Sequence, residues 1–395
     1  MRWQLRLGIA AGAVSLIGAA PAPQGTWTRA WTASMWQAAP VPAQMVSVDN
    51  ATIRSAVRVG ASGGKIRLRL VNDYGPALSI GAVTARVAGG PAVRVTFDGQ
   101  GATSVPEGAP LVSDPVPLPV KAFDIVEVSI YFPGKADLTT VHAASGAPTY
   151  VSAPGDRSGE AFTPVAKHNS RPLLAGIDVL TPKPRPIVVA YGDSITDNTG
   201  CANDAVPVCR WSDVLARRLA AAGKPHVVVT QAISGNRILA NGTGPSALAR
   251  LDRDVLAVPG VTTIVLLEGI NDIGGSGRVR DGVAAPTITA DQLIQGYRQL
   301  VTRAHDRGIK VIAMTVLPYE GAGYYTEAGE AMRTRVNAWI RTSGTFDGVI
   351  DMEEVVADPA NPKRLAADLQ RGDNLHPDGR GETRMGEAID LKLFR

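Results

Sequence analysis

Residues 187–197 read IVVAYGDSITD, and this stretch decides the fold of the C-terminal part of the chain. Its first five residues are apolar and include three with β-branched side chains, which is typical of a strand buried on both faces of a parallel sheet. Gly192 then lets the chain turn sharply, and Ser194 follows at the end of the strand. A serine at this position presents its hydroxyl beyond the sheet edge, where a nucleophile could act. Considered by itself, Ser194 also fits the N-cap of a helix.

The pattern that begins here continues toward the C-terminus as an alternation of strands and helices. Short apolar runs recur at residues 227–230, 263–267, 310–315 and 348–350. Helical periodicity lies between them, most clearly at 291–307, where Thr289 and Gln292 predict a capping box and Gly308 predicts the end. A second helix is expected from Trp211 to just before Gly223. Such alternation predicts an open, doubly wound α/β sheet whose ligands bind beyond the carboxyl ends of the strands.

The part of the chain that precedes residue 187 has a different pattern of apolar and polar residues. Residues 65–70 alternate apolar side chains with cations, and residues 124–132 repeat the two-residue period of a half-buried strand. Turn residues separate several such runs, so we expect an antiparallel β-sandwich, or jelly-roll-like, module at residues 26–180. Proline at every second position of PKPRP predicts a linker at 181–186. The α/β domain is then expected at 187–395.

The N-terminal residues indicate export. Arg2 and Arg6 precede a weakly charged run that ends in small residues, which predicts a signal peptide over residues 1–22 and a secreted or periplasmic protein. A membrane anchor is the alternative, but the uncharged run of 14 residues is short for a bilayer span, so we expect no membrane span after cleavage. Proline follows both Ala20 and Ala22, so the cleavage position stays open.

Charge and cysteine content narrow the partners. The formal net charge is +4, and no run of five or six like charges occurs, so nucleic acid is not expected to bind. The two cysteines, Cys201 and Cys209, predict a loop disulfide in an exported protein. A metal site at these cysteines is disfavoured, since two thiolates without a nearby histidine supply too few ligands.

Polar residues also follow the next two predicted strands. Ser234-Gly235-Asn236 comes after the second strand, and Gly269-Ile270-Asn271-Asp272 comes after the third. A tetrahedral oxyanion needs several donors directed at one point, and the Gly235 N–H and the Asn271 carboxamide can supply them. Taken singly, each of these residues is equally typical of a turn.

The segment GDNLHPDG, residues 372–379, contains a carboxylate and an imidazole three residues apart. Serine becomes an effective nucleophile when an imidazole accepts its proton and a carboxylate orients that imidazole. Asp373 and His376 fit these roles. We interpret His226 and His305 as structural or surface residues, and His142 and His168 lie in the strand-rich part without a nucleophile motif beside them.

Three further sequence features resemble functional motifs, but the residues around them favour a structural role. Residues 60–64, GASGG, fit the nucleophile-elbow pattern, yet they join two predicted strands, so Ser62 is interpreted as a hairpin residue. Residues 274–277, GGSG, predict a loop at the rim of the crevice. The tryptophans Trp27, Trp31 and Trp36 are expected to pack in the core or between domains, with stacking on sugars as the alternative.

The blocks GDSIT, SGN, GIND and DNLH occur in an order that resembles the signature of the SGNH, or GDSL-type, serine hydrolases. The resemblance spans roughly residues 186–395 and implies a three-layer α/β/α fold of flavodoxin-like type, with no metal or organic cofactor. The roles that it implies are Ser194 as nucleophile, His376 as general base, Asp373 as its orienting carboxylate, and the Ser194 amide, the Gly235 amide and the Asn271 side chain as the oxyanion hole.

A narrower similarity suggests the substrates. Residues 244–272 are similar to a subgroup of arylesterases and acylhydrolases, some of them associated with xylan breakdown, and the strand-rich part looks like the N-terminal module of some secreted members. The expected function is a secreted serine esterase acting on short-chain acyl esters, of the carbohydrate O-acetyl or aryl type, in a small molecule or a polysaccharide. A lipase or lysophospholipase with the same triad and a non-catalytic polysaccharide-binding protein are the alternatives. The oligomeric state is left open.

Overall fold

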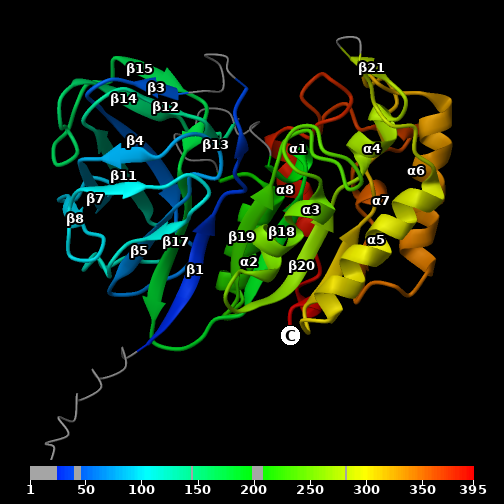
Figure 1. Ribbon diagram of the computed structural model, residues 1–395. Coiled ribbons are helices and arrows are strands. Elements are labelled where there is room, and N and C mark those ends of the chain that lie inside the picture. Colours follow the sequence, from blue (N-terminus) through cyan, green and yellow to red (C-terminus); the bar gives the residue numbers. More distant parts are fainter. Residues whose placement is uncertain (1–24, 40–45, 144–145, 198–207, 281–282) are drawn as a thin grey trace, which may run out of the picture.

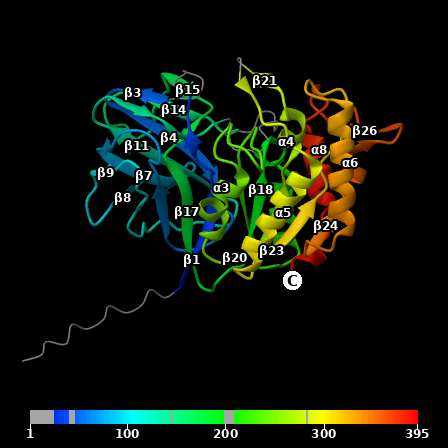
Figure 2. The same cartoon turned by 45° about the vertical axis from the view of Figure 1, so that its right-hand side comes forward.

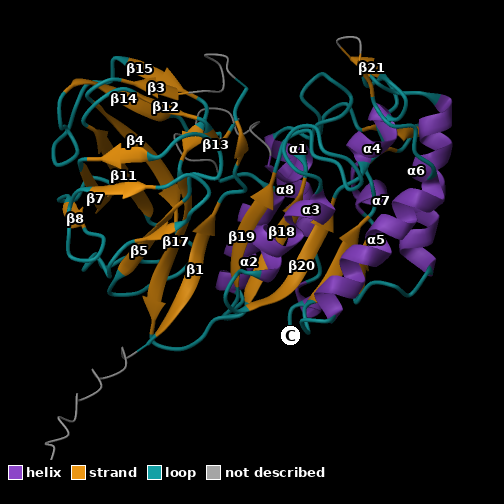
Figure 3. Ribbon diagram, in the orientation of Figure 1, coloured by secondary structure: helices purple, strands orange, loops and turns teal. Residues whose placement is uncertain are grey.

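The computed structural model of the chain describes residues 25–39, 46–143, 146–197, 208–280 and 283–395. A strand-rich part, here called the β region (residues 25–181), is followed by a part with alternating strands and helices, the α/β region (residues 187–395), as Figures 1 and 3 show. The predicted signal peptide and Cys201 lie outside the described residues, so export and the disulfide stay predictions. Within the described ranges, none of the helices has the length and apolar composition of a membrane span.

The α/β region is built on five parallel strands in the spatial order β19-β18-β20-β23-β24. They are β18 (Ile187–Gly192), β19 (Val227–Ala232), β20 (Val261–Leu267), β23 (Lys310–Met314) and β24 (Gly348–Ile350). The first strand lies between the second and the third, which is the 2-1-3-4-5 order of flavodoxin-like doubly wound sheets. Every residue of β18 is buried, as its uninterrupted apolar run predicted. The prediction of a parallel α/β sheet is confirmed.

Helices cover both faces of this sheet. Their bounds are α1 (Ser194–Asp197), α2 (Trp211–Ala221), α3 (Ala247–Leu251), the π-helical turn η1 (Asp252–Leu256), α4 (Ile270–Gly275), α5 (Ala290–His305), α6 (Glu327–Thr342), α7 (Met352–Val356), α8 (Gly379–Ala388) and the 3-10 turn η2 (Leu391–Leu393). The helix α2 packs against α8, whereas α3 and α6 pack against α5. Right-handed crossovers place these two groups on opposite faces, and Figure 2 shows α3 and α5 together in front of the sheet.

The start of α5 confirms a prediction made from the sequence. Thr289 is its N-cap and accepts a hydrogen bond from the Gln292 backbone, while the Gln292 side chain accepts one from the Thr289 backbone. This reciprocal pair satisfies two of the N–H groups that a helix start leaves without partners. Gly308, three residues beyond the helix, adopts the left-handed conformation with φ of 67°.

The β region consists of antiparallel sheets, as predicted. A four-stranded sheet has the order β1-β17-β5-β10, and a six-stranded sheet has the order β15-β14-β4-β11-β7-β8. Alternate side chains of both sheets contribute to one hydrophobic core. The bounds are β1 (Thr26–Thr32), β2 (Trp36–Gln37), β3 (Val46–Val48), β4 (Ala51–Arg58), β5 (Ile66–Leu70), β6 (Leu78–Ile80), β7 (Ala82–Val87), β8 (Val93–Val95), β9 (Thr103–Val105), β10 (Leu111–Val112), β11 (Ile125–Phe132), β12 (Ala136–Leu138), β13 (Thr140–His142), β14 (Thr149–Pro154), β15 (Ala166–His168), β16 (Arg171–Pro172) and β17 (Leu174–Thr181).

Among the described residues, four two-stranded pairings and one three-stranded sheet lie outside these main sheets. In the α/β region, β21 (Val279–Arg280) pairs with β22 (Val283–Ala284), and β25 (Ala357–Asp358) pairs with β26 (Asn361–Leu365). In the β region, β6 pairs with β9, β3 pairs with β12, and β13 lies between β16 and β2. All of these pairings are antiparallel.

Two loop predictions were wrong. Ser62 does not lie in a hairpin, because the strands on either side of it, β4 and β5, belong to different sheets; its Oγ accepts a hydrogen bond from the Ala122 N–H at 2.8 Å. Gly274 and Gly275 form the last turn of α4 and not a loop. Glycine is required there by packing, since a Cβ at Gly274 would come within 1.9 Å of the Tyr324 ring.

The two regions meet along an edge. Strand β1, at the edge of the four-stranded sheet, packs beside β19, at the edge of the parallel sheet (Figure 1). Just beyond this contact the Thr32 hydroxyl donates to the Thr230 carbonyl at 2.9 Å, and the Ser34 hydroxyl donates to the Gln231 side chain at 2.8 Å. The exposed edge of the parallel sheet is thereby covered, which removes an open strand edge from solvent.

Candidate active site

The carboxyl ends of three neighbouring strands bring the predicted residues to one place. Gly192, the last residue of β18, pairs in register with Ala232 of β19 on one side and with Leu267 of β20 on the other. Adjacent strands lie about 4.8 Å apart, so the three loops leave the sheet side by side. Each of these loops carries one predicted residue close to the strand end: Ser194 lies two residues after Gly192, Gly235 three residues after Ala232, and Asn271 four residues after Leu267.

The side chains of the predicted triad form a continuous hydrogen-bonded series. Ser194 Oγ lies 2.8 Å from His376 Nε2, and His376 Nδ1 lies 2.7 Å from Asp373 Oδ2. Ser194 is the first residue of α1, while Asp373 and His376 lie in the loop that leads into α8. Asp373 Oδ1 also accepts the backbone N–H groups of Leu375 and His376, which fixes the carboxylate against its own loop.

The electrostatics of this series suit proton transfer from serine to histidine. Burial raises the pKa of Asp373, but the hydrogen bonds from His376 and Leu375 outweigh it and bring that pKa down to about 2. The carboxylate is therefore ionised and accepts the Nδ1 proton, which leaves Nε2 free to accept the Ser194 proton. Burial also holds the pKa of His376 below its ordinary 6.5, although Asp373 opposes this, so the imidazole is neutral at pH 7.

Gly235 and Asn271 border a common cavity, and each has a conformation that suits a donor role. Gly235 has φ of 80°, in the left-handed region that favours glycine. The Asn271 amide is oriented by two contacts: its Nδ2 donates to the Asn236 carbonyl at 3.0 Å, and its Oδ1 accepts from the Tyr324 hydroxyl at 3.5 Å. A carboxamide has two N–H groups, so one remains to donate to a ligand.

This cavity, here called the substrate cavity, has a volume of about 1050 Å³ and is open to solvent. Its lining comes from both regions of the chain, because Trp36 and Ala39 of the β region border it beside Gly235 and Asn271. The remaining described residues that line it are Arg237, Asn241, Gly242, Thr243, Gly274, Gly275, Arg278, Val279, Ala284, Ala285, Pro286, Gly323 and Tyr324. Trp36 lies between the two regions, as expected, and it also borders this cavity.

A buried arginine, which no sequence motif singled out, lies under the strand ends. Arg250 donates to the Gly192 carbonyl at 2.9 Å, to the Gln231 carbonyl at 3.0 Å and to Asn236 Oδ1 at 2.8 Å. It also stacks over the Tyr191 ring at 4.2 Å. By joining the end of β18 to the loop after β19, Arg250 fixes the spacing between the turn that carries Ser194 and the turn that carries Gly235.

Buried carboxylates lie near Arg250 at these strand ends. Arg250 forms ion pairs with Asp254 at 3.2 Å and with Glu268 at 3.7 Å. Burial raises the pKa of Asp193 to about 7 and that of Asp272 to about 6, and it raises the pKa of Glu268 well above its usual range. Asp193 accepts the Ile195 N–H at 2.9 Å and so shapes the turn that carries Ser194. Burial and the repulsion between neighbouring carboxylates both favour the protonated forms of Asp193 and Glu268.

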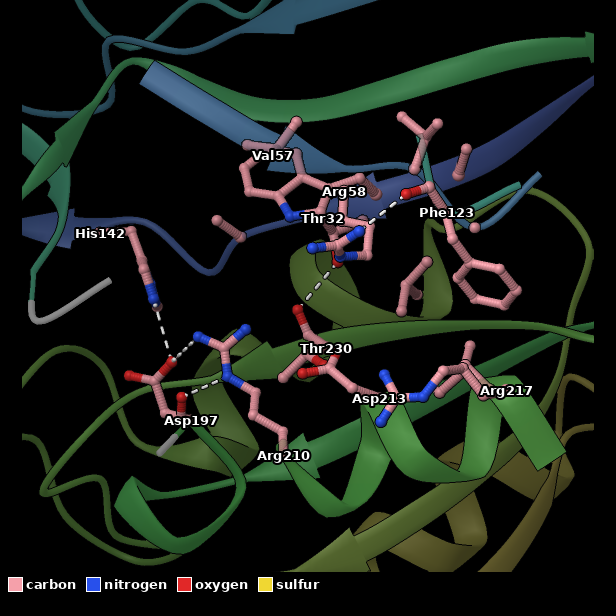
Figure 4. A pocket seen from close by; sticks show the side chains of 18 of the residues that line it. Thr32, Val57, Arg58, Phe123, His142, Asp197, Arg210, Asp213, Arg217 and Thr230 are labelled. Carbon is pink, nitrogen blue, oxygen red and sulfur yellow. Dashed lines mark hydrogen bonds and ion pairs between the residues drawn. The ribbon is translucent and has the colours of Figure 1, made fainter. Parts of the chain in front are cut away.

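The turn that carries Ser194 also contacts the β region. Asp197, the last residue of α1, accepts hydrogen bonds from His142 Nε2 and from the Ser234 hydroxyl, both at 3.1 Å. His142 comes from β13, and its Nδ1 lies 3.0 Å from the Ser34 carbonyl. Figure 4 shows His142 and Arg210 both directed at Asp197. A histidine of the β region thus contacts the helix that begins with the candidate nucleophile, a role that its sequence context did not indicate.

The space beside these side chains is a small cavity of about 70 Å³ between the two regions (Figure 4). Arg171 lines it, and its guanidinium packs over the Trp31 ring at 5.0 Å. Burial and, to a smaller extent, Arg210 lower the pKa of Arg171 to about 9, and Asp197 opposes both effects. A cavity of this volume holds a few water molecules and is too small for an ester of a sugar, so we assign it to the interface and not to catalysis.

The chain is similar to known proteins in sequence and in structure. Residues 190–384 match the family model described as GDSL-like Lipase/Acylhydrolase family. Similar solved structures include an acetyl xylan esterase (21% identity, covering 51% of this chain and 96% of that chain, TM-score 0.39). Others are a variant of an acetyl-xylooligosaccharide esterase from Geobacillus (20% identity, 53% and 94%, TM-score 0.40) and a psychrotrophic esterase from Pseudoalteromonas (17% identity, 51% and 93%, TM-score 0.38). The comparison with curated proteins found no match.

The matched residues run from the end of β18 into α8 and so include every strand end and loop described above. The predicted signature blocks all fall inside them. Through residues 190–384 this chain belongs to the GDSL-like lipase/acylhydrolase family and is a carboxylic ester hydrolase.

Proposed function

We propose that the protein is a secreted serine esterase that hydrolyses short-chain acyl esters, of the carbohydrate O-acetyl or aryl type, through a Ser-His-Asp triad. The observation that supports this best is the hydrogen-bonded series from Ser194 Oγ through His376 to Asp373, with distances of 2.8 and 2.7 Å. Such a series is the requirement for activating a serine hydroxyl.

Acylation begins when Ser194 Oγ attacks the ester carbonyl and His376 Nε2 accepts the hydroxyl proton. The carbonyl oxygen becomes an oxyanion, which the Ser194 and Gly235 amides and the Asn271 side chain stabilise. The intermediate collapses, the bond to the alcohol oxygen breaks, and His376 returns the proton to the departing alcohol.

Deacylation repeats these steps with water. His376 takes a proton from a water molecule that attacks the acyl-enzyme carbonyl, and the second intermediate releases the carboxylic acid and regenerates the Ser194 hydroxyl. Asp373 stays ionised throughout and stabilises the imidazolium that forms in both half-reactions.

The lining of the substrate cavity favours a polar alcohol over a long acyl chain. Arg237, Asn241 and Thr243 place polar groups along the wall that leads to Gly235. A lipase with the same triad needs a continuous apolar trough for its acyl chain, because each buried CH₂ group contributes about 0.8 kcal/mol. A series of p-nitrophenyl esters of increasing acyl length separates the two: we expect kcat/KM to fall from acetate to octanoate, and a rise would favour the lipase.

The mechanism is tested by Ser194→Ala. We expect turnover of p-nitrophenyl acetate and labelling by a fluorophosphonate to be lost while the protein stays folded. Ser62→Ala is the matched control, because Ser62 stands in a G-x-S-x-G sequence but lies between two β-region strands. Near-wild-type turnover in Ser194→Ala would rule out the mechanism, and failure of the wild type to react with the fluorophosphonate would favour a non-catalytic polysaccharide-binding protein.

The oxyanion hole is tested separately. We expect Asn271→Ala to lower kcat by roughly 10²- to 10³-fold with little change in KM, as loss of one oxyanion donor does. A change confined to KM would instead make Asn271 a residue that binds the substrate in its ground state.

A further inference from the structure

The β region contributes an aromatic side chain to the substrate cavity. Trp36 lies in β2, which pairs with β13, and an added Cβ at Gly244 would lie 3.3 Å from the Trp36 Cβ, which places Trp36 beside the loop that follows Gly235. The residues before Trp36 are held firmly: the Met35 carbonyl accepts from Arg253 at 2.7 Å, and the Ser34 hydroxyl accepts from Arg250 at 3.1 Å. Trp36 is therefore presented by a fixed backbone that both regions anchor.

Arginine side chains cover the rings of Trp27 and Trp31, but none covers the ring of Trp36 among the described residues. Arg67 packs over the Trp27 ring at 4.6 Å, and Arg171 packs over the Trp31 ring at 5.0 Å. Within the described ranges no cation or aromatic ring covers Trp36, which is partly buried and borders the cavity. A flat aromatic face in such a position can bury the apolar C–H face of a sugar ring while the ring hydroxyls stay in water.

The charged side chains among the described residues that line the substrate cavity are all positive. Arg237 and Arg278 line it, whereas none of its described lining residues is Asp or Glu. The hydrogen bonds that these two guanidinium groups make go to uncharged carbonyl oxygens, of Asn241 for Arg237 and of Gly323 for Arg278. Asp272 is close enough to Arg237 for the two to interact, but its oxygens already accept the N–H groups of Ile238 and Leu239.

From these observations we infer that the alcohol part of the substrate is an anionic saccharide, one that carries a carboxylate as a uronic acid does. Its ring stacks on Trp36 and its carboxylate pairs with Arg237 and Arg278, while its ester group reaches Gly235 and Asn271. Guanidinium groups bind carboxylates with hydrogen bonds from two nitrogens, and the free positive charge favours the approach of an anion. This inference rests on the proposed esterase function and adds to it the class of alcohol.

The experiment compares three acetyl esters on the wild-type protein: an acetylated methyl glucuronoside, the corresponding acetylated methyl glucoside, and ethyl acetate. Because a hydrogen bond to a charged group is stronger than one to a neutral group, we expect kcat/KM to be about tenfold higher for the glucuronoside than for the glucoside, a difference of about 1.4 kcal/mol. Raising the salt concentration should shrink this preference, because the arginines are open to solvent. Equal kcat/KM for the two sugars overturns the charge assignment.

Substitutions test which residues cause the preference for the anionic sugar and which bind the sugar ring. Arg278→Gln and Arg237→Gln should each reduce the preference for the glucuronoside and leave the glucoside unchanged, with Arg335→Gln on the outer side of α6 as the control. Trp36→Ala should raise KM for both sugars by about tenfold and leave kcat/KM for ethyl acetate within twofold, with Trp27→Ala as the control. The ethyl acetate rate also reports whether each variant is folded.

The outcomes separate this inference from the function on which it rests. One outcome is that the wild type hydrolyses ethyl acetate while Trp36→Ala has wild-type kinetic constants for all three esters. In that case the inferred saccharide site is wrong, and the proposed esterase function is unaffected. If the wild type hydrolyses none of the three and no fluorophosphonate labels Ser194, the proposed function itself has failed.

Discussion

The contact between His142 and Asp197 predicts that a residue of the β region affects catalysis without touching the substrate. Replacing His142 by alanine removes two buried hydrogen bonds, one to Asp197 Oδ1 at 3.1 Å and one to the Ser34 carbonyl at 3.0 Å. Burial raises the pKa of Asp197, but His142, Arg210 and the Ser234 hydroxyl outweigh it and hold that pKa below its usual range.

The size of the effect follows from these contacts. A hydrogen bond to a charged group contributes about 1.5–3 kcal/mol and one to a neutral group about 1 kcal/mol, so we expect His142→Ala to lower the free energy of unfolding by roughly 3 kcal/mol. The loss stays below that of an unpaired buried charge, because Asp197 keeps Ser234 at 3.1 Å and an ion pair with Arg210 at 3.9 Å.

Catalysis should change with stability, because Asp197 ends the helix that begins with Ser194 and also holds Ser234, the neighbour of Gly235. A small displacement of either turn misaligns the oxyanion donors, so kcat for p-nitrophenyl acetate should fall by about tenfold while KM stays the same. His142→Gln keeps one donor and should recover part of both losses.

The assays are urea unfolding followed by tryptophan fluorescence and steady-state kinetics on the same preparations. His168→Ala is the control, since His168 lies in the same region on the edge strand β15. If His142→Ala has wild-type stability and kcat, the contact does not support the site. A loss of stability with unchanged kcat shows that it joins the regions without positioning the catalytic groups.

Two further predictions concern the triad and the oxyanion hole. His376 must be neutral to accept a proton, and burial holds its pKa below 6.5 against the opposing effect of Asp373, so activity should be lost as the pH falls through a midpoint below 6.5. Asp373→Asn removes that opposing effect: the midpoint of kcat/KM against pH should fall further and kcat should drop by about 10⁴-fold, whereas an upward shift would contradict the assignment. Gly235→Ala places a Cβ 2.9 Å from Thr243 Oγ1 at a φ of 80°, so urea titration should show a loss of about 1–2 kcal/mol. Its kcat should fall with it, and wild-type kcat would mean that the Gly235 N–H is not a donor in catalysis.

The architecture could be predicted from the sequence alone, because local residue patterns indicate local secondary structure. Uninterrupted apolar runs such as IVVAY predicted the buried parallel strands, and alternating runs such as residues 65–70 predicted the antiparallel ones. The capping box predicted at Thr289 and Gln292 is present, and α5 begins at Ala290, one residue before the predicted start. Candidate site residues also came from the sequence, since each of them follows a strand or precedes a helix within a short motif.

Only the tertiary structure could decide which distant segments meet. Ser62 was assigned to a hairpin because two strands flank it, but which strands pair depends on the whole sheet. For Trp36 the sequence left core packing and sugar stacking as alternatives, and it did not indicate the roles of His142 and Arg250, because a histidine or an arginine outside a motif looks the same in the sequence whether it packs in a core or borders a catalytic turn. Their roles arise from contacts between separate segments of the chain, such as His142 with Asp197 across 55 residues and Ser34 with Arg250 across 216, which no local periodicity encodes.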